Sequence, residues 1–149
     1  MTAVLAPCPG RVMPMSETPD PVFAGEMVGP GVTIDPDPGM TTVISPISGK
    51  VIKMHPHAFV VLGADGVGVL VHLGINTVRL EGKGFEVLVG QGATVSAGDP
   101  MVRWDPSTIT DETMSPVVPV VAMDRPKGSI PAPGPGTVKT GDLLFTVER

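Results

Sequence analysis

The sequence predicts an all-β protein, an antiparallel β-sandwich or barrel with a duplicated motif and one short helix. Its apolar residues fall in many short runs rich in Val, Leu and Ile, which is typical of strands. The 19 glycines and 18 prolines stand between these runs, where tight turns need them. Many short strands at regular spacing are typical of sandwiches and barrels.

The first third of the chain alternates short apolar runs with turn residues. The elements expected there are an apolar run at residues 22–24 and strands at residues 32–34, 43–44 and 51–52. Residues 35–39 read Asp-Pro-Asp-Pro-Gly, and successive prolines cannot join a regular ladder. We therefore expect a loop at these five positions.

The strongest local signal is a hairpin in the middle of the chain. Apolar runs at residues 58–62 and 67–73 flank Asp65 and Gly66. Asp-Gly between such runs predicts a two-residue turn, because Gly accepts a positive φ and Asp tolerates it. The resulting register places five residues on one face of the hairpin: His57, Phe59, Leu70, His72 and Gly74.

This register makes His57 and His72 diagonal cross-strand neighbours. Their backbone positions would lie about 7–8 Å apart, within reach of two converging imidazoles. Gly74, opposite His57, leaves room beside the rings. A slip of one residue in the register would place the two histidines on opposite faces.

The second half of the chain continues the β pattern and adds the helix. The elements expected there are an extended segment at residues 77–80, a turn at 81–84, strands at 85–89, 101–104, 117–123 and 143–147, and a proline-rich loop at 129–136. Asp105 can cap a helix and Pro106 can open one, since the first helical position needs no free N–H. We expect that helix to run to about Met114.

Two segments occur twice in related form. Residues 7–15 and 46–54 share the pattern Pro-x-x-Gly-basic-Val-x-x-Met, and residues 94–99 resemble residues 137–142. Both members of the second pair begin Thr-Val and end Gly-Asp before an apolar run. The repeats indicate a duplicated β-motif in which Gly-Asp turns lead into equivalent strands.

The bulk composition excludes several classes of protein. A net charge of −5 argues against nucleic-acid binding, which needs clustered Lys and Arg. The single cysteine, Cys8, cannot form an internal disulfide, which suits a reducing cytoplasm. We expect no signal peptide and no membrane insertion, because the chain has neither a basic leader nor a run approaching the ~20 apolar residues of a membrane span.

Around His72 the string Gly-Val-Gly-Val-Leu-Val-His-Leu-Gly-Ile-Asn-Thr-Val, residues 66–78, resembles a known signature. It is that of the glucose-type enzyme IIA (EIIA) domain of the bacterial phosphoenolpyruvate:sugar phosphotransferase system. Residues 57–59 resemble the family's second-histidine segment, and residues 20–29 and 80–85 resemble its early loop and post-site turn. The likeness spans about residues 6–147.

The resemblance implies that residues 1–149 form a single cytoplasmic EIIA phosphocarrier domain with the family's antiparallel β-sandwich. The family forms a phosphohistidine intermediate by taking a phosphoryl group from the carrier HPr, here onto His72. It then passes the group to a cysteine of a sugar-specific IIB domain of a membrane permease. It requires no cofactor, and other regulatory proteins often read its phosphorylation state.

The resemblance also implies roles for residues near His72. The Gly74 carbonyl would accept the Nδ1 proton of His72 and leave Nε2 free to attack, which a neutral imidazole does well near pH 7. His57 would donate a hydrogen bond to the phosphoryl oxygens. An apolar docking patch would surround the histidines, and its expected members are Val22, Phe23, Met54 and Leu70. Asp20 would lie at its rim and attract the basic surface of HPr.

Two positions depart from the family pattern. The free signature position, often Asp, is Asn76, which removes one charge from the rim. The residue two before the second histidine, often a Thr that orients its ring, is His55. The first change affects carrier recognition, and the second leaves open what orients His57.

Two other functional classes remain open at this point. The side chains of His55, His57, His72 and Asp20 have the composition of a zinc-hydrolase site, although no Glu beside a ligand is available as general base. The pair His57 and His72 is also a candidate for incidental zinc binding. A biotin- or lipoate-carrying domain would need Lys53 on a tight hairpin tip, and the residues after it do not predict such a turn.

Overall fold

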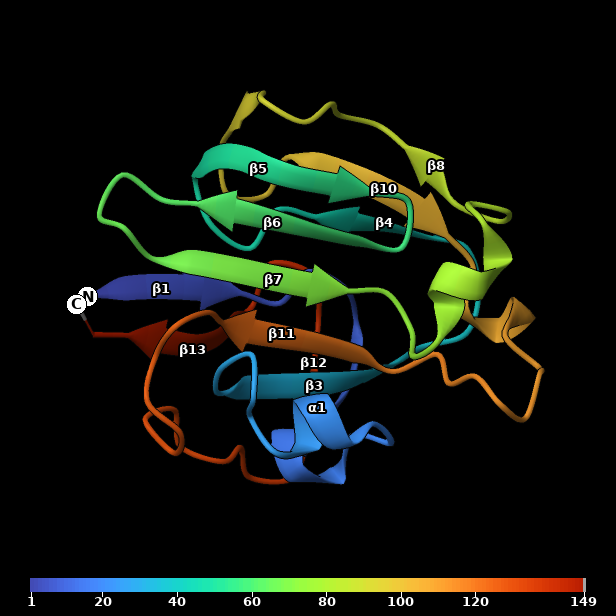
Figure 1. Cartoon of the computed structure of the whole chain (residues 1–149), viewed down its shortest axis with the longest axis horizontal. Coiled ribbons are helices and arrows are strands. Elements are labelled where there is room, and N and C mark those ends of the chain that lie inside the picture. The colour runs from blue at the N-terminus through green and yellow to red at the C-terminus, as the bar shows by residue number, and fades with distance from the viewer. Residues whose placement is uncertain (149) are drawn as a thin grey trace.

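The computed structural model describes residues 1–148, which fold almost entirely into antiparallel strands (Figure 1). In chain order the elements are β1 (Thr2–Leu5), β2 (Gly10–Pro14), η1 (Met15–Glu17), α1 (Pro21–Ala24), β3 (Gly31–Pro36), β4 (Thr41–Ile44), β5 (Gly49–His55), β6 (Ala58–Leu62), β7 (Gly68–His72), η2 (Thr77–Leu80), β8 (Glu86–Val87), β9 (Thr94–Val95), β10 (Pro100–Trp104), η3 (Pro106–Thr108), β11 (Val118–Ala122), β12 (Thr137–Val138) and β13 (Leu143–Val147). None of the helices among these residues has the length and apolar character needed to cross a membrane.

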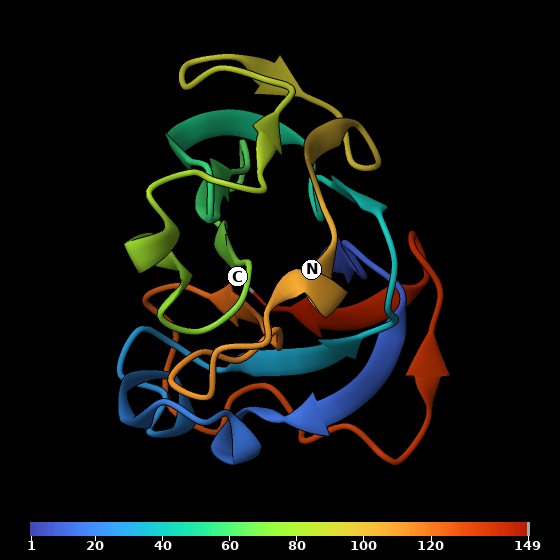
Figure 2. The same cartoon turned by 90° about the vertical axis from the view of Figure 1, so that its right-hand side faces the viewer.

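Within residues 1–148 the strands form three sheets arranged in two layers. The large sheet has the order β12-β2-β3-β11-β7-β6-β5-β9, and the smaller sheets have the orders β1-β13 and β4-β10-β8. Strands β5, β6, β7 and β11 of the large sheet lie in front in Figure 1, with β1, β13, β4 and β10 of the smaller sheets behind them; Figure 2 shows this arrangement from the side. The predicted antiparallel β-sandwich is therefore confirmed.

The main core fills the space between the two layers. Its largest fully buried side chains include Trp104, Phe59, Ile34, Leu73 and Met101. Val supplies most of the remainder, because aromatic residues make up only 3% of the sequence. The large sheet therefore buries one face, and its other face carries a smaller apolar cluster and the candidate site.

The repeated sequence segments occupy equivalent places in the fold. Gly10 and Arg11 of β2 pair with Val138 and Thr137 of β12. In the same register, Gly49 and Lys50 of β5 pair with Val95 and Thr94 of β9. Each member of the first repeat thus pairs with a member of the second repeat, which supports the duplicated motif.

The Gly-Asp turns of the second repeat are also equivalent. The carboxylate of Asp99 accepts the backbone N–H of Ser96, and that of Asp142 accepts the N–H of Lys139, both at 2.8 Å. Each Asp therefore closes its own turn just before the following strand, β10 or β13.

Equivalent backbone bonds join the two halves of the duplication. The N–H of Leu5 donates to the carbonyl of Pro46 at 2.9 Å, and the N–H of Ile44 donates to that of Pro7 at 3.0 Å. Leu5 and Ile44 hold matching places just before the two copies of the first repeat. The two bonds are therefore equivalent by a pseudo-twofold axis that relates the two copies of the repeat.

The central hairpin closes through a three-residue loop, so the predicted two-residue turn is wrong. Gly63 donates its N–H to the carbonyl of Val67 at 2.9 Å, and Gly66 donates to that of Gly63 at 3.0 Å. Gly66 has a φ of +85°, which fits a type I turn followed by a left-handed residue. Asp-Gly suits this loop as well as the two-residue turn.

The longer loop shifts the pairing of β6 with β7 by one residue. Ala58 lies opposite His72, and Phe59 lies opposite Val71. Phe59 therefore points into the main core, where it is fully buried, and does not share a face with His72 as we expected.

Four other local predictions need correction. The expected loop at residues 35–39 begins two residues later, because Asp35 and Pro36 still belong to β3, where they lie opposite Arg11 and Gly10 of β2. The apolar run at residues 22–24 belongs to α1, because the Asp20 carboxylate accepts the N–H groups of Val22 and Phe23 and Pro21 opens the helix. Residues 77–80 form the 3₁₀ helix η2 rather than an extended segment. Asp105 and Pro106 do open a helical turn, but it ends at Thr108.

The first test concerns Gly49, the glycine that begins β5. A Cβ at Gly49 would lie 2.2 Å from the carbonyl oxygen of Leu62. We expect Gly49→Ala to lower the free energy of unfolding by about 1–3 kcal/mol, because backbone must move to admit the methyl group. Urea denaturation measures the change.

Gly90→Ala is the matched control, because a Cβ there meets no heavy atom within 4 Å and the residue does not have a positive φ. It should change the free energy of unfolding by less than about 0.5 kcal/mol. Equal stabilities for Gly49→Ala and Gly90→Ala would contradict the close packing of β5 on β6.

Candidate functional site

His72 ends β7 on the outer face of the large sheet. Its neighbours along the strand, Val71 and Leu73, are fully buried in the main core, so alternation points the half-buried His72 ring the other way. Directly opposite on β6 lies Ala58, whose small side chain leaves space beside the ring. The strand thus presents His72 at its end, next to the loop that follows.

A hydrogen bond to the backbone fixes the state of the His72 ring. Nδ1 lies 2.5 Å from the carbonyl oxygen of Gly74. A carbonyl can only accept, so Nδ1 carries the proton and Nε2 of the neutral ring keeps a free lone pair. This is the arrangement that the family resemblance implied.

Gly74 serves this bond through its backbone. It has a φ of +83°, and a Cβ there would lie 2.5 Å from Thr77 Cγ2 and 2.9 Å from the carbonyl oxygen of Ser115. Its N–H donates to the carbonyl of Val117 at 3.1 Å. The glycine therefore allows the turn that aims its carbonyl at His72, the role that the family resemblance implied for Gly74.

His57 reaches the same place from the turn between β5 and β6. Its ring centroid lies 5.2 Å from that of His72, with the planes at 78°. The carbonyl of His57 accepts the N–H of Leu73 at 2.6 Å, which fixes this turn beside the end of β7. The two histidines meet as expected, but by a different route: His57 lies outside the strand, so the shift in register does not turn it away.

Both rings are neutral at pH 7. Burial, followed by repulsion from His72 and His55, lowers the pKa of His57 to about 4. Burial also lowers the pKa of His72, although the Gly74 hydrogen bond and the charge of Asp20 oppose this effect. A neutral His72 with a free Nε2 is a competent nucleophile.

Helix α1 covers one side of His72. Phe23 is buried, and its ring centroid lies 5.1 Å from that of His72 at 59°. Phe23 belongs to the small outer cluster, whose buried members are Met13, Met15, Phe23, Ile75, Val117 and Val121. Asp20 caps α1 and also acts electrostatically on His72, so it lies near the site as we expected of a rim residue.

The structure brings together only some of the residues that we expected to surround the histidines. Val22 on α1 is 43% exposed, and Leu70 packs against the outer cluster on the His72 face of β7. Met54, however, lies opposite Phe59 and packs against the main core, so it does not join the histidines.

Other residues complete the outer face beside Leu70. A shallow depression of about 270 Å³ is lined by Lys53, His55, Ala58, Phe59, Val60 and Leu70. Lys53 and Val60, which pair across β5 and β6, were not among the residues predicted to lie near the site. With the correct register, Ala58 lies opposite His72, and the alternation of side chains along the strands then places Val60 and Lys53 on the same face of the sheet.

Asn76 fixes the segment that follows Gly74. It has a φ of +63°, a conformation that Asn tolerates better than most residues. Its Nδ2 donates to the carbonyl of Thr113 at 2.9 Å, and Arg79 Nη2 donates to the same oxygen at 3.0 Å. The side chain thus ties the loop before β11 to the site, a role that the sequence pattern did not indicate.

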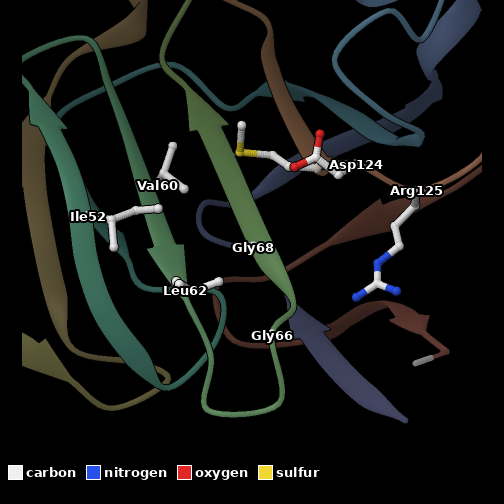
Figure 3. Close-up of a pocket in the computed structure, with 8 residues that line it drawn as sticks. Ile52, Val60, Leu62, Gly66, Gly68, Asp124 and Arg125 are labelled. Carbon is white, nitrogen blue, oxygen red and sulfur yellow. The ribbon is translucent and has the colours of Figure 1, made fainter.

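A second hollow of about 350 Å³ lies at the opposite end of the same strands (Figure 3). Its lining residues are Ile52, Val60, Leu62, Gly66, Gly68, Met123, Asp124 and Arg125. None of them is a predicted site residue. Gly68 begins β7 and His72 ends it, so the hollow is separate from the histidines.

The two alternative functions lack the geometry that they need. Among residues 1–148 no three or more His, Cys, Asp or Glu side chains are grouped to hold a metal ion. The ring of His55 stacks on that of His57 and does not converge with it on a common point. Lys53 lies within β5 and not on a hairpin tip, as a biotin- or lipoate-carrying lysine would.

Comparisons with known proteins identify the family of this chain. The family model for the phosphoenolpyruvate-dependent sugar phosphotransferase system, EIIA 1, matches residues 2–128. The PTS system glucose-specific EIIA component of Bacillus cereus is 40% identical over 120 residues, covering 79% of this chain and 72% of the relative. That of Staphylococcus epidermidis is 42% identical over 120 residues, covering 79% and 71%.

A solved structure is similar along nearly the whole chain. The glucose permease IIA of Mycoplasma capricolum is 34% identical, with a TM-score of 0.86, and the match covers 96% of this chain and 93% of that one. The family model and the relatives rest on sequence, and this match adds the fold. The chain therefore belongs to the EIIA 1 family of the phosphoenolpyruvate-dependent sugar phosphotransferase system.

Proposed function

We propose that this protein is a cytoplasmic phosphocarrier that takes a phosphoryl group from phosphorylated HPr onto His72 and passes it to a cysteine of a IIB domain. One observation carries the proposal: the bond of 2.5 Å between His72 Nδ1 and the Gly74 carbonyl leaves Nε2 unprotonated. The relatives' names specify glucose, and we extend that sugar to the pathway served here.

In the first step Nε2 of His72 attacks the phosphorus of phospho-HPr. The bond from phosphorus to the HPr histidine breaks as the bond to Nε2 forms, and the Nδ1 proton stays on the ring, facing Gly74. Phosphoryl transfer demands positioning and charge stabilisation more than covalent chemistry. The transfer passes directly between side chains and needs no cofactor, and we assign zinc no part in it.

His57 stabilises the transferred group. It is neutral at pH 7 because its pKa is about 4, so one ring nitrogen carries a proton that can be donated. Its ring lies 5.2 Å from that of His72, close enough to hydrogen-bond a phosphoryl group on Nε2. In the second step a IIB cysteine thiolate attacks phosphorus, and Nε2 regains its lone pair.

The surface around His72 suits docking by other proteins. Val22 is exposed on α1, Leu70 on β7 is half-buried against the outer cluster, and Asp20 supplies a negative charge near the His72 ring. Apolar contact excludes water from the transfer, and the acidic rim attracts a basic carrier. We propose that HPr and the IIB domain use this surface in turn, and that regulatory proteins reading the phosphorylation state bind there too.

The direct test removes the acceptor. Incubation with phosphoenolpyruvate, enzyme I and HPr should place an acid-labile phosphate on the wild-type chain and none on His72→Ala, because the variant lacks the Nε2 lone pair that the bond from Nδ1 to Gly74 leaves free. Phosphate content by intact mass measures the outcome. HPr should be labelled in both reactions, and label that persists on His72→Ala would disprove the assignment.

A second test separates the roles of the histidines. His57→Ala should still accept phosphate but pass it to a IIB domain about 10²–10³-fold more slowly, the usual loss on removing one donor to a transition-state oxygen. Quench-flow kinetics of each step measure this. His57→Gln keeps an N–H donor and should recover part of the rate; wild-type transfer by His57→Ala would refute the role.

The third test follows pH. NMR titration should give a pKa of about 4 for His57 and a lowered pKa for His72, below the ordinary 6.5. The unfolded chain then binds more protons than the folded one below pH 6.5, so the free energy of unfolding should fall as pH drops from 6.5 toward 4.

The urea-unfolded chain is the control, since its histidines should titrate near the ordinary value. Phosphate acceptance should also decline as His72 gains a proton and loses its nucleophilic lone pair. Folded-state titration of both rings at about 6.5 would contradict the lowered pKa values of the pair.

A further inference from the structure

The third histidine of the chain lies beside the proposed phosphoryl site. His55 ends β5, its side chain is exposed, and its ring stacks on that of His57 with the centroids 5.9 Å apart and the planes at 30°. His57 therefore has an aromatic ring on each of two sides, since the His72 centroid lies 5.2 Å from its own.

The sheet explains why the three rings meet. His55 on β5 pairs with Ala58 on β6, and Ala58 pairs with His72 on β7, so the three positions form one row across neighbouring strands. Strands lie about 4.8 Å apart, so the outer two positions are about 10 Å from each other. The methyl group of Ala58 leaves a gap between them, and the His57 ring lies between the other two.

Hydrogen bonds do not fix the orientation of the His57 ring. In the part of the chain that the structure describes, no hydrogen bond to that ring is found, and the bond from Leu73 N–H holds only the backbone of His57. The His72 ring meets His57 edge-on at 78°, whereas His55 lies nearly parallel to it. Stacking restricts rotation of the ring out of that plane.

We propose that His55 is a positioning residue for phosphoryl transfer, holding the His57 imidazole by stacking so that its N–H faces a phosphoryl group on His72. The inference rests on the proposed function. His55 itself does not touch the phosphoryl group. Transfer depends steeply on such alignment, because a small misplacement of a donor removes much of its effect.

The test compares variants of His55 in the two transfer steps. His55→Ala should accept phosphate from phospho-HPr at the wild-type rate and pass it to a glucose-specific IIB domain up to about tenfold more slowly, the loss expected for one ring contact. His55→Phe keeps a ring without a proton and should restore transfer to within about twofold. Lys50→Ala, at an exposed position on the same strand, is the matched control and should leave both steps unchanged.

A second variant shows whether His55 acts through His57. If it does, adding His55→Ala to His57→Ala should cause no further loss. Wild-type transfer by His55→Ala, an equal loss in the His57→Ala background, or failure of His55→Phe to restore the rate would each overturn the proposal. Urea midpoints equal to wild type confirm that the variants fold, since His55 is exposed.

These outcomes are distinct from failure of the proposed function. Phosphate on His72→Ala would remove the acceptor assignment and with it the basis of this inference. Phosphate confined to His72, together with wild-type transfer by His55→Ala, would leave the phosphocarrier intact and reject only the positioning role.

Discussion

The hydrogen bond from His72 Nδ1 to the Gly74 carbonyl is the constraint on which the site depends. At 2.5 Å it fixes which nitrogen carries the proton and which can attack. It requires a backbone that turns back within two residues, and Gly74 supplies that turn with a φ of +83°. Bonds from the segment just before β11 then hold the turn: Val117 accepts from Gly74, and Ser115 exchanges bonds with Ile75. The chemistry of one ring thus depends on backbone bonds to the segment that leads into β11.

The surroundings of the pair balance two opposing demands. A nucleophilic imidazole must be neutral, and burial under α1 lowers the pKa of His72, but a phosphocarrier must also remain open to visiting proteins. The small outer cluster buries the His72 ring on one side only, where Phe23 of α1 lies against it. The other side is left to His57, which is half-buried, and to His55, which is exposed. Asp20 has two effects here: it caps α1, which covers His72, and its negative charge limits the fall in the His72 pKa.

The sequence predicted what local chemistry determines. The Gly-Asp turns were identified correctly because their hydrogen bonds lie within a few residues, and the repeated segments because the repeat is visible in the sequence itself. The hairpin register was not, because Asp-Gly fits loops of two and of three residues and only the packing of Phe59 decides between them. Helix α1 was missed although Asp20 and Pro21 carry the same cap signal that we used at Asp105. Asn76 was interpreted as a lost charge, since its bond to Thr113 joins segments that are distant in the sequence.

The tautomer of His72 tests the central claim most directly. A long-range ¹H–¹⁵N correlation spectrum of the unphosphorylated protein at pH 7 distinguishes a protonated ring nitrogen from a bare one. The account predicts a proton on Nδ1, shifted by its bond to Gly74, and an Nε2 resonance typical of an unprotonated nitrogen. A spectrum in which Nε2 carries the proton and Nδ1 is bare would contradict it, because the ring would then face its partners without a free lone pair.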